Sequence, residues 1–122
     1  MFEGVLVGES LRAGAELSGV PLSVNRVRRV AGAGATDAQP ADWTLIDFTV
    51  PDSAAPALAA ALARCLSADG GWYADFRSDQ EVYVVLADRV CRYRRGDAAG
   101  RERARAYARS AGVPETQLDW AE

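Results

Sequence analysis

The order of strand-like and helix-like stretches is the feature of this sequence that most restricts its fold. Two successive parts of the chain each contain three short strand-like stretches, followed by one stretch with apolar residues at helical spacing. The expected strands are residues 2–7, 20–25, 43–50, 72–77, 81–87 and 90–95, and the expected helices are residues 54–68 and 98–111. The order βββαβββα predicts an α+β fold: an antiparallel sheet or partly closed barrel of about six strands, with both helices packed on one side.

The length and composition of the chain suit one domain spanning residues 1–122. Apolar residues make up 49% and charged residues 25% of the chain, which is close to the average of globular proteins. Residues 31–42 are rich in Gly and Ala and show no period, which predicts a mobile loop. The apolar alternation of residues 20–25 breaks at Asn25, which predicts either a β-bulge or the end of that strand.

The residues that flank the expected helices have the chemistry of helix ends. Asp52 or Ser53 is expected to accept hydrogen bonds from the first turn of the first helix, and Asp97 from the first turn of the second. Near the C-terminus, Leu118 and Trp120 are too apolar to extend into solvent, so we expect this segment to pack back on the domain.

Missing residue types exclude much catalytic chemistry. The chain has no His and no Lys, so all 14 basic residues are Arg. The lack of His excludes Ser-His-Asp and Cys-His catalysis and histidine metal ligands, and the lack of Lys excludes Schiff-base chemistry. Two cysteines cannot form a four-thiolate zinc site, and no calcium loop, P-loop or dinucleotide fingerprint occurs. We therefore expect no metal and no cofactor, and favour a protein that is not an enzyme.

Charge and hydropathy bear on location and partners. The net charge of −3 and the isoelectric point of about 5.0 disfavour generic binding to nucleic acid or to anionic membranes. No apolar run approaches the roughly 20 residues that cross a bilayer, and the first residues lack the pattern of a signal peptide. The sequence predicts a cytoplasmic protein with no membrane association.

The second group of strands predicts which side chains share a face. Two-residue turns at residues 78–79 and 88–89 would place Asp75 opposite Val82, and Val82 opposite Arg95. One face then carries most of the aliphatic weight and should belong to the core. That face consists of Tyr73, Asp75, Val82, Val84, Leu86, Cys91, Tyr93 and Arg95.

Asp75 is the charged residue that this arrangement singles out, because a carboxylate near a core needs a partner. In one interpretation Asp75 forms a structural ion pair with Arg95 across one strand. In the other it is an acid-base group in a cleft, assisted by Tyr73 or Tyr93. The catalytic candidates of the sequence are therefore Asp75, Tyr93 and, on the third strand, Asp47.

The opposite face combines aromatic and Arg side chains, a mixture that is enriched at binding surfaces. The predicted binding residues are Trp72, Phe76, Tyr83, Arg92 and Arg94. The alternative is that the first helix or the first three strands cover this face, in which case Trp72 and Phe76 are ordinary core residues.

Three functions remain open. The leading hypothesis is a non-enzymatic interaction or ligand-binding module, homodimeric, that uses the aromatic and Arg face to bind a protein partner or a small ligand. The second is a cofactor-free isomerase or cyclase in which Asp75 or Asp47 moves protons. The third is an inhibitor or immunity-like protein that binds a basic partner through Asp79, Glu81 and Asp88.

Overall fold

The computed structural model describes residues 1–32, 35 and 37–122. In this part of the chain, six strands form one antiparallel sheet in the order β2-β3-β1-β4-β5-β6. The strands are β1 Phe2–Val7, β2 Ser23–Ala31, β3 Asp42–Val50, β4 Ala74–Arg77, β5 Glu81–Leu86 and β6 Arg89–Arg94. The helices are α1 Ala55–Cys65 and α2 Ala98–Ser110, with short 3-10 turns η1 Gly8–Ser10, η2 Asp52–Ala54 and η3 Glu115–Gln117. The α+β class and the predicted order of elements are confirmed, and the sheet is open because β2 and β6 form its two edges.

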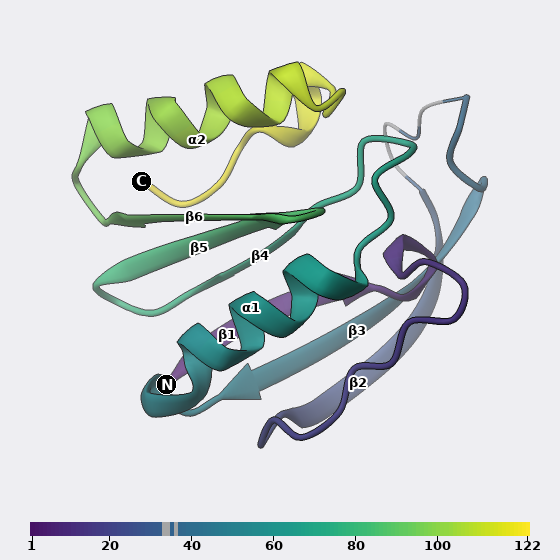
Figure 1. The fold of residues 1–122 in the computed structure, drawn as a ribbon, viewed down its shortest axis with the longest axis horizontal. Helices are drawn as coiled ribbons and strands as arrows, with labels where there is room; N and C mark the ends of the chain where they lie inside the picture. The colour runs from purple at the N-terminus through teal and green to yellow at the C-terminus, as the bar shows by residue number, and fades with distance from the viewer. Residues whose placement is uncertain (33–34, 36) are drawn as a thin grey trace.

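The two helices lie on opposite faces of the sheet (Figure 1). Tyr83 and Val85 of β5 belong to the apolar cluster around α1, whereas their neighbours Val82 and Val84 belong to the cluster around α2. The expectation that both helices cover one side is therefore wrong. The helices lie on opposite faces because β5 is apolar on both of its faces, and each face is buried by packing against one helix. We call the α1 side the inner face and the α2 side the outer face.

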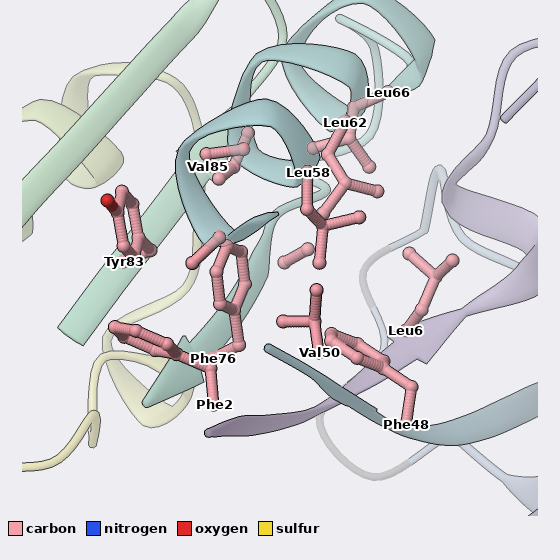
Figure 2. Close-up of a cluster of buried hydrophobic side chains, with 13 residues drawn as sticks. Phe2, Leu6, Phe48, Val50, Leu58, Leu62, Leu66, Phe76, Tyr83 and Val85 are labelled. Atoms are coloured by element: carbon pink, nitrogen blue, oxygen red, sulfur yellow. The ribbon is translucent and has the colours of Figure 1, made fainter. Parts of the chain in front are cut away.

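The core of the inner face lies between α1 and four strands (Figure 2). Aromatic rings from β1, β3, β4 and β5 meet there, and the Phe76 and Tyr83 rings stack with their centroids 4.9 Å apart. Gly4 of β1 makes room for them, since a Cβ atom at Gly4 would lie 2.7 Å from the Cβ of Phe76. The cluster comprises Phe2, Leu6, Phe48, Val50, Ala55, Leu58, Ala59, Leu62, Leu66, Ala74, Phe76, Tyr83 and Val85.

The pairing of β4, β5 and β6 differs from the predicted register by two residues. Asp75 lies opposite Val84 rather than Val82, and Val82 lies opposite Tyr93 rather than Arg95. Each turn is displaced by one residue: the Ser78 amide donates to the Glu81 carbonyl around residues 79–80, and the second reversal falls at residues 87–88. Because side chains alternate with a period of two, a displacement of two residues leaves every side chain on its predicted face.

The segment from β2 to β3 departs from the sequence prediction in its extent. The predicted β-bulge is confirmed, since the register shifts between Val24 and Arg26. However, β2 begins three residues later than expected and continues to Ala31, while Asp42 already belongs to β3. The predicted mobile loop of residues 31–42 is thus shorter at both ends. Residues 33, 34 and 36 of that loop lie outside the described residues.

The helix ends follow the sequence prediction in part. Neither Asp52 nor Ser53 caps α1, which begins after Ala54 without a side-chain cap, and Asp52 instead pairs with the amino group of Met1. Asp97 does cap α2, because its carboxylate accepts a hydrogen bond of 3.0 Å from the Gly100 amide. The C-terminal segment packs back as expected, with Leu118 and Trp120 buried against α2 and the outer face.

Replacement of Asp97 by Ala should lower the free energy of unfolding by about 1 kcal/mol, because it removes the acceptor for the first turn of α2. Urea unfolding monitored by circular dichroism measures this change. Asp97→Asn is the matched control, since its amide oxygen still accepts the hydrogen bond and most of the stability should remain. An equal loss in both variants would contradict a capping role.

Candidate ligand-binding site

The outer face of the sheet is covered over only part of its width. The α2 helix and the C-terminal segment pack on β5 and β6 through residues such as Val82, Val84 and Tyr93. On β1, the outward side chain of Val5 remains 38% exposed. This region of the outer face, next to the covered part, is where the candidate site lies.

Both carboxylates that the sequence analysis singled out as proton-transfer candidates lie in this region. Val5 of β1 pairs with Asp47 of β3 on one side and with Asp75 of β4 on the other. Paired residues point to the same face, so the two carboxylates flank Val5 at a distance of two strand spacings, about 10 Å. The structure thus brings together Asp47 and Asp75, which lie far apart in the sequence.

Two cavities adjoin at Asp75. The first, which we call the charged cavity, has a volume of about 330 Å³. It is lined by Glu3, Gly4, Val5, Asn25, Asp47, Phe48, Asp75 and Arg77. The second, which we call the aromatic cavity, has a volume of about 140 Å³ and is lined by Val5, Val7, Trp43, Trp72, Tyr73, Asp75 and Gln117. Asp75 and Val5 belong to both linings.

The carboxylate of Asp75 is held in an unfavourable environment. Burial raises the pKa of Asp75 from 3.8 to about 6, although neighbouring Arg77 favours the charged form; nearby Asp119 adds to the rise. Among the described residues, no other side chain donates a hydrogen bond to this carboxylate or forms an ion pair with it. The charge of Arg77 thus offsets only part of the desolvation cost that the Asp75 carboxylate carries.

Asp47 provides the contrast. The Arg26 guanidinium donates to its carboxylate over 2.7 Å, and Arg28 approaches the same oxygen at 3.4 Å. These hydrogen bonds hold the pKa of Asp47 below its ordinary value. The charge of Asp47 is therefore already balanced within the chain, and Asp75 is the carboxylate that lacks a partner.

The predicted partnership of Asp75 with Arg95 does not form. The main chain of Arg95 donates to the Gln80 carbonyl, and its guanidinium donates to the Ser78 carbonyl over 3.1 Å. The displaced turns cause this difference, because they place Val84 and then Cys91 in the row of Asp75. The interpretation of Asp75 as one half of a structural ion pair with Arg95 is thus wrong.

The two tyrosines proposed as helpers of Asp75 are placed differently. Tyr93 is buried under the C-terminal segment, where its hydroxyl donates to the Ala121 carbonyl, and it lines neither cavity at Asp75. Burial raises its pKa. Tyr73 does line the aromatic cavity with Asp75, and its hydroxyl donates to the Gln117 carbonyl over 3.0 Å. Burial, followed by the charge of Asp75, raises the pKa of Tyr73.

The predicted aromatic and Arg binding face is the inner face, and α1 covers it. Phe76 is fully buried and Tyr83 is 2% exposed beneath α1, as the alternative interpretation expected for Phe76. Trp72 is 8% exposed, but it precedes β4, packs against Trp43 and lines the aromatic cavity. Arg92 and Arg94 stay exposed at the edge strand β6. Arg92 stacks over the Tyr83 ring, 5.0 Å from its centroid, and pairs with Glu81. A flat, exposed aromatic patch is therefore not present on these strands.

The acidic residues of the inhibitor hypothesis do not form a ridge. Asp79 and Glu81 lie at one end of β5 and Asp88 lies beyond the other end, so a strand of about 20 Å separates them. Glu81 also forms a salt bridge with Arg92. A basic partner would thus meet no continuous acidic surface along these turns.

Sequence reasoning missed the aromatic cavity. Trp43 is the second residue of β3, and Trp72 and Tyr73 immediately precede β4. Within the described residues, β1 lies between these two strands and pairs with both. The indole rings of Trp43 and Trp72 meet edge to face, with centroids 5.5 Å apart. A pattern of spacing along the chain carries no signal for this meeting of strands.

Comparisons with protein-family models, with curated proteins and with solved structures gave no match to this chain. Within the described residues, no group of His, Cys, Asp and Glu side chains is arranged to hold a metal ion. No helix in the same residues is long and apolar enough to span a membrane. The geometry around Asp75 is therefore the basis on which a function can be proposed.

Proposed function

We propose that this chain is a ligand-binding module that binds a small organic molecule with a cationic group, using Asp75 as the counter-ion. The observation that carries the proposal is the Asp75 carboxylate, which lines two adjoining cavities and has no partner side chain among the described residues. A bound cation would supply the interaction that the protein does not.

The dimensions and charges of the charged cavity agree with such a ligand. Its volume of about 330 Å³ falls within the roughly 300–1,000 Å³ typical of small-molecule sites. Glu3 and Asp75 contribute two negative charges to the lining against the one positive charge of Arg77, and the charge of Asp47 is balanced by Arg26 and Arg28. The potential in the cavity should thus favour a positive group near Asp75.

A screen of small ammonium compounds against the protein tests this proposal. We expect compounds that bind the wild type at pH 7.5 to bind at least tenfold more weakly to Asp75→Asn, which removes the counter-ion. Binding to the wild type should also weaken below pH 6, because Asp75 then takes up a proton and loses its charge. Isothermal titration calorimetry measures both changes.

Asp47→Asn is the matched control, because it removes a carboxylate from the same cavity that already has protein partners. We expect this variant to lose less affinity than Asp75→Asn does, although Arg26 and Arg28 are then left without their carboxylate. If no ammonium compound binds, or if binding is insensitive to Asp75, the proposed function is wrong.

One observation favours a second function, a cofactor-free enzyme. A pKa of about 6 places Asp75 close to the range in which a carboxylate both accepts and donates protons efficiently. Arg77 lies two residues further along β4 on the same face, where its guanidinium would polarise a carbonyl group.

Proton NMR of bound compounds in D₂O discriminates the two functions. An enzyme of this kind exchanges carbon-bound protons of the ligand and loses that activity in Asp75→Asn, whereas a binding module does not exchange them.

A further inference from the structure

The aromatic cavity has the side-chain chemistry of a site for an organic cation. Trp43, Trp72 and Tyr73 contribute three aromatic rings to its lining, and Asp75 contributes a carboxylate. The Trp43 and Trp72 rings pack edge to face, with their planes at 61°, and both residues line the cavity. Each ring face carries a partial negative charge that attracts a cation.

Contacts elsewhere in the chain fix the orientation of these rings. The Trp43 indole nitrogen donates to the Pro40 carbonyl over 3.0 Å. The Tyr73 ring meets the Trp120 ring edge to face at 5.5 Å, and its hydroxyl is held by the Gln117 carbonyl. Because the polar atoms of Trp43 and Tyr73 are already engaged, these residues have mainly apolar ring surface to present to a ligand.

This distribution of polar groups discriminates between kinds of cation. A primary ammonium group has three N–H donors, and each needs an acceptor when it is buried. Apart from Gln117, the other described residues of the lining are aliphatic or aromatic, and the Asp75 carboxylate is the charged acceptor. A quaternary ammonium group has no N–H donor and interacts through its charge and methyl surface alone, which suits aromatic walls beside one carboxylate.

We propose that the cationic group of the ligand is a methylated, quaternary ammonium, seated between Trp43, Trp72 and Tyr73 with Asp75 as its counter-ion. This inference rests on the proposed function and names the class of its ligand. The cavity volume of about 140 Å³ accommodates a head group of a few heavy atoms, and the remainder of the ligand extends into the charged cavity past Asp75.

Three probes of similar size test the inference by calorimetry at pH 7.5: choline, ethanolamine, and 3,3-dimethyl-1-butanol, which has the shape of choline without its charge. We expect wild-type protein to bind choline at least tenfold more tightly than either of the others. Asp75→Asn and Trp43→Leu should each weaken choline binding about tenfold, whereas Trp43→Phe keeps a ring and should retain most of the affinity. Thermal unfolding confirms that each variant is folded.

The possible results separate the inference from the proposed function. If ethanolamine binds as tightly as choline, with the same dependence on Asp75, the proposed preference for a methylated head group is overturned. The proposed function as a cation-binding module then still stands. Equal affinity for choline and 3,3-dimethyl-1-butanol overturns recognition of charge and therefore both proposals. Choline binding that is unchanged in Trp43→Leu places the cation outside the aromatic cavity and overturns the inference.

Discussion

Replacement of Phe76 by Ala should lower the free energy of unfolding by about 3–5 kcal/mol, the usual cost of removing a buried Phe ring. Phe76 is fully buried, stacks on Tyr83, and meets the rings of Phe2 and Phe48 edge to face. The cavity left by the ring cannot close easily, because α1 and the strands hold its walls. Urea unfolding of the purified variant measures the loss.

The same experiment tests the placement of the predicted aromatic surface on the inner face. Phe76→Leu is the matched control, since it keeps most of the apolar volume and should cost less than the change to Ala. If Phe76 lay on an exposed binding surface, its replacement by Ala would change stability by no more than about 0.5 kcal/mol. A loss that small would contradict the inner-face core.

Replacement of Asp75 by Asn should have the opposite effect and stabilise the protein at pH 8. A rise of the pKa from 3.8 to about 6 corresponds to a destabilisation of about 3 kcal/mol when the carboxylate is charged. Because the side chain is partly exposed to solvent in the cavities, we expect a gain of about 2 kcal/mol from the neutral amide. A site that keeps a charged, partnerless group at the expense of stability is typical of function.

The pH dependence follows from the direction of the shift. Between about pH 4 and pH 6 the folded protein binds more protons at Asp75 than the unfolded chain does, so the contribution of Asp75 to stability falls as the pH rises through this window. The difference in unfolding free energy between Asp75→Asn and wild type should grow over the same range and level off above it. Asp47→Asn is the control of opposite sign. Because the pKa of Asp47 is lowered, the charged carboxylate stabilises the fold at any pH above the ordinary pKa of Asp. Replacement of Asp47 by Asn should therefore lower the free energy of unfolding at pH 8.

The local half of the fold was predictable from the sequence. The strands β4, β5 and β6 follow one another along the chain and pair with their immediate neighbours, so alternation and turns were sufficient to assign their faces. The exact register was not predictable, because a turn displaced by one residue is chemically almost equivalent: residues 79–80 and 87–88 reverse the chain in place of residues 78–79 and 88–89.

The arrangement of the site was less predictable, because it depends on a pairing between distant segments. The first strand, β1, lies between β3 and β4, and this insertion brings Asp47, Val5 and Asp75 into one row. The sequence identified Asp75 and Asp47 as carboxylates on strands. It did not show which of the two lacks a partner side chain. That difference arises from Arg26 and Arg28, which reach Asp47 only because β2 pairs with β3 across the β-bulge.

Titration of the Asp75 side-chain carboxyl by carbon-13 NMR, with and without choline, tests the central claim most directly. The resonance is assigned by its absence in Asp75→Asn. We predict a midpoint near pH 6 in the free protein and a lower midpoint with saturating choline, because a bound cation favours the charged carboxylate. A midpoint near 3.8 that choline does not move would contradict both the environment of Asp75 and its role as the counter-ion of a ligand.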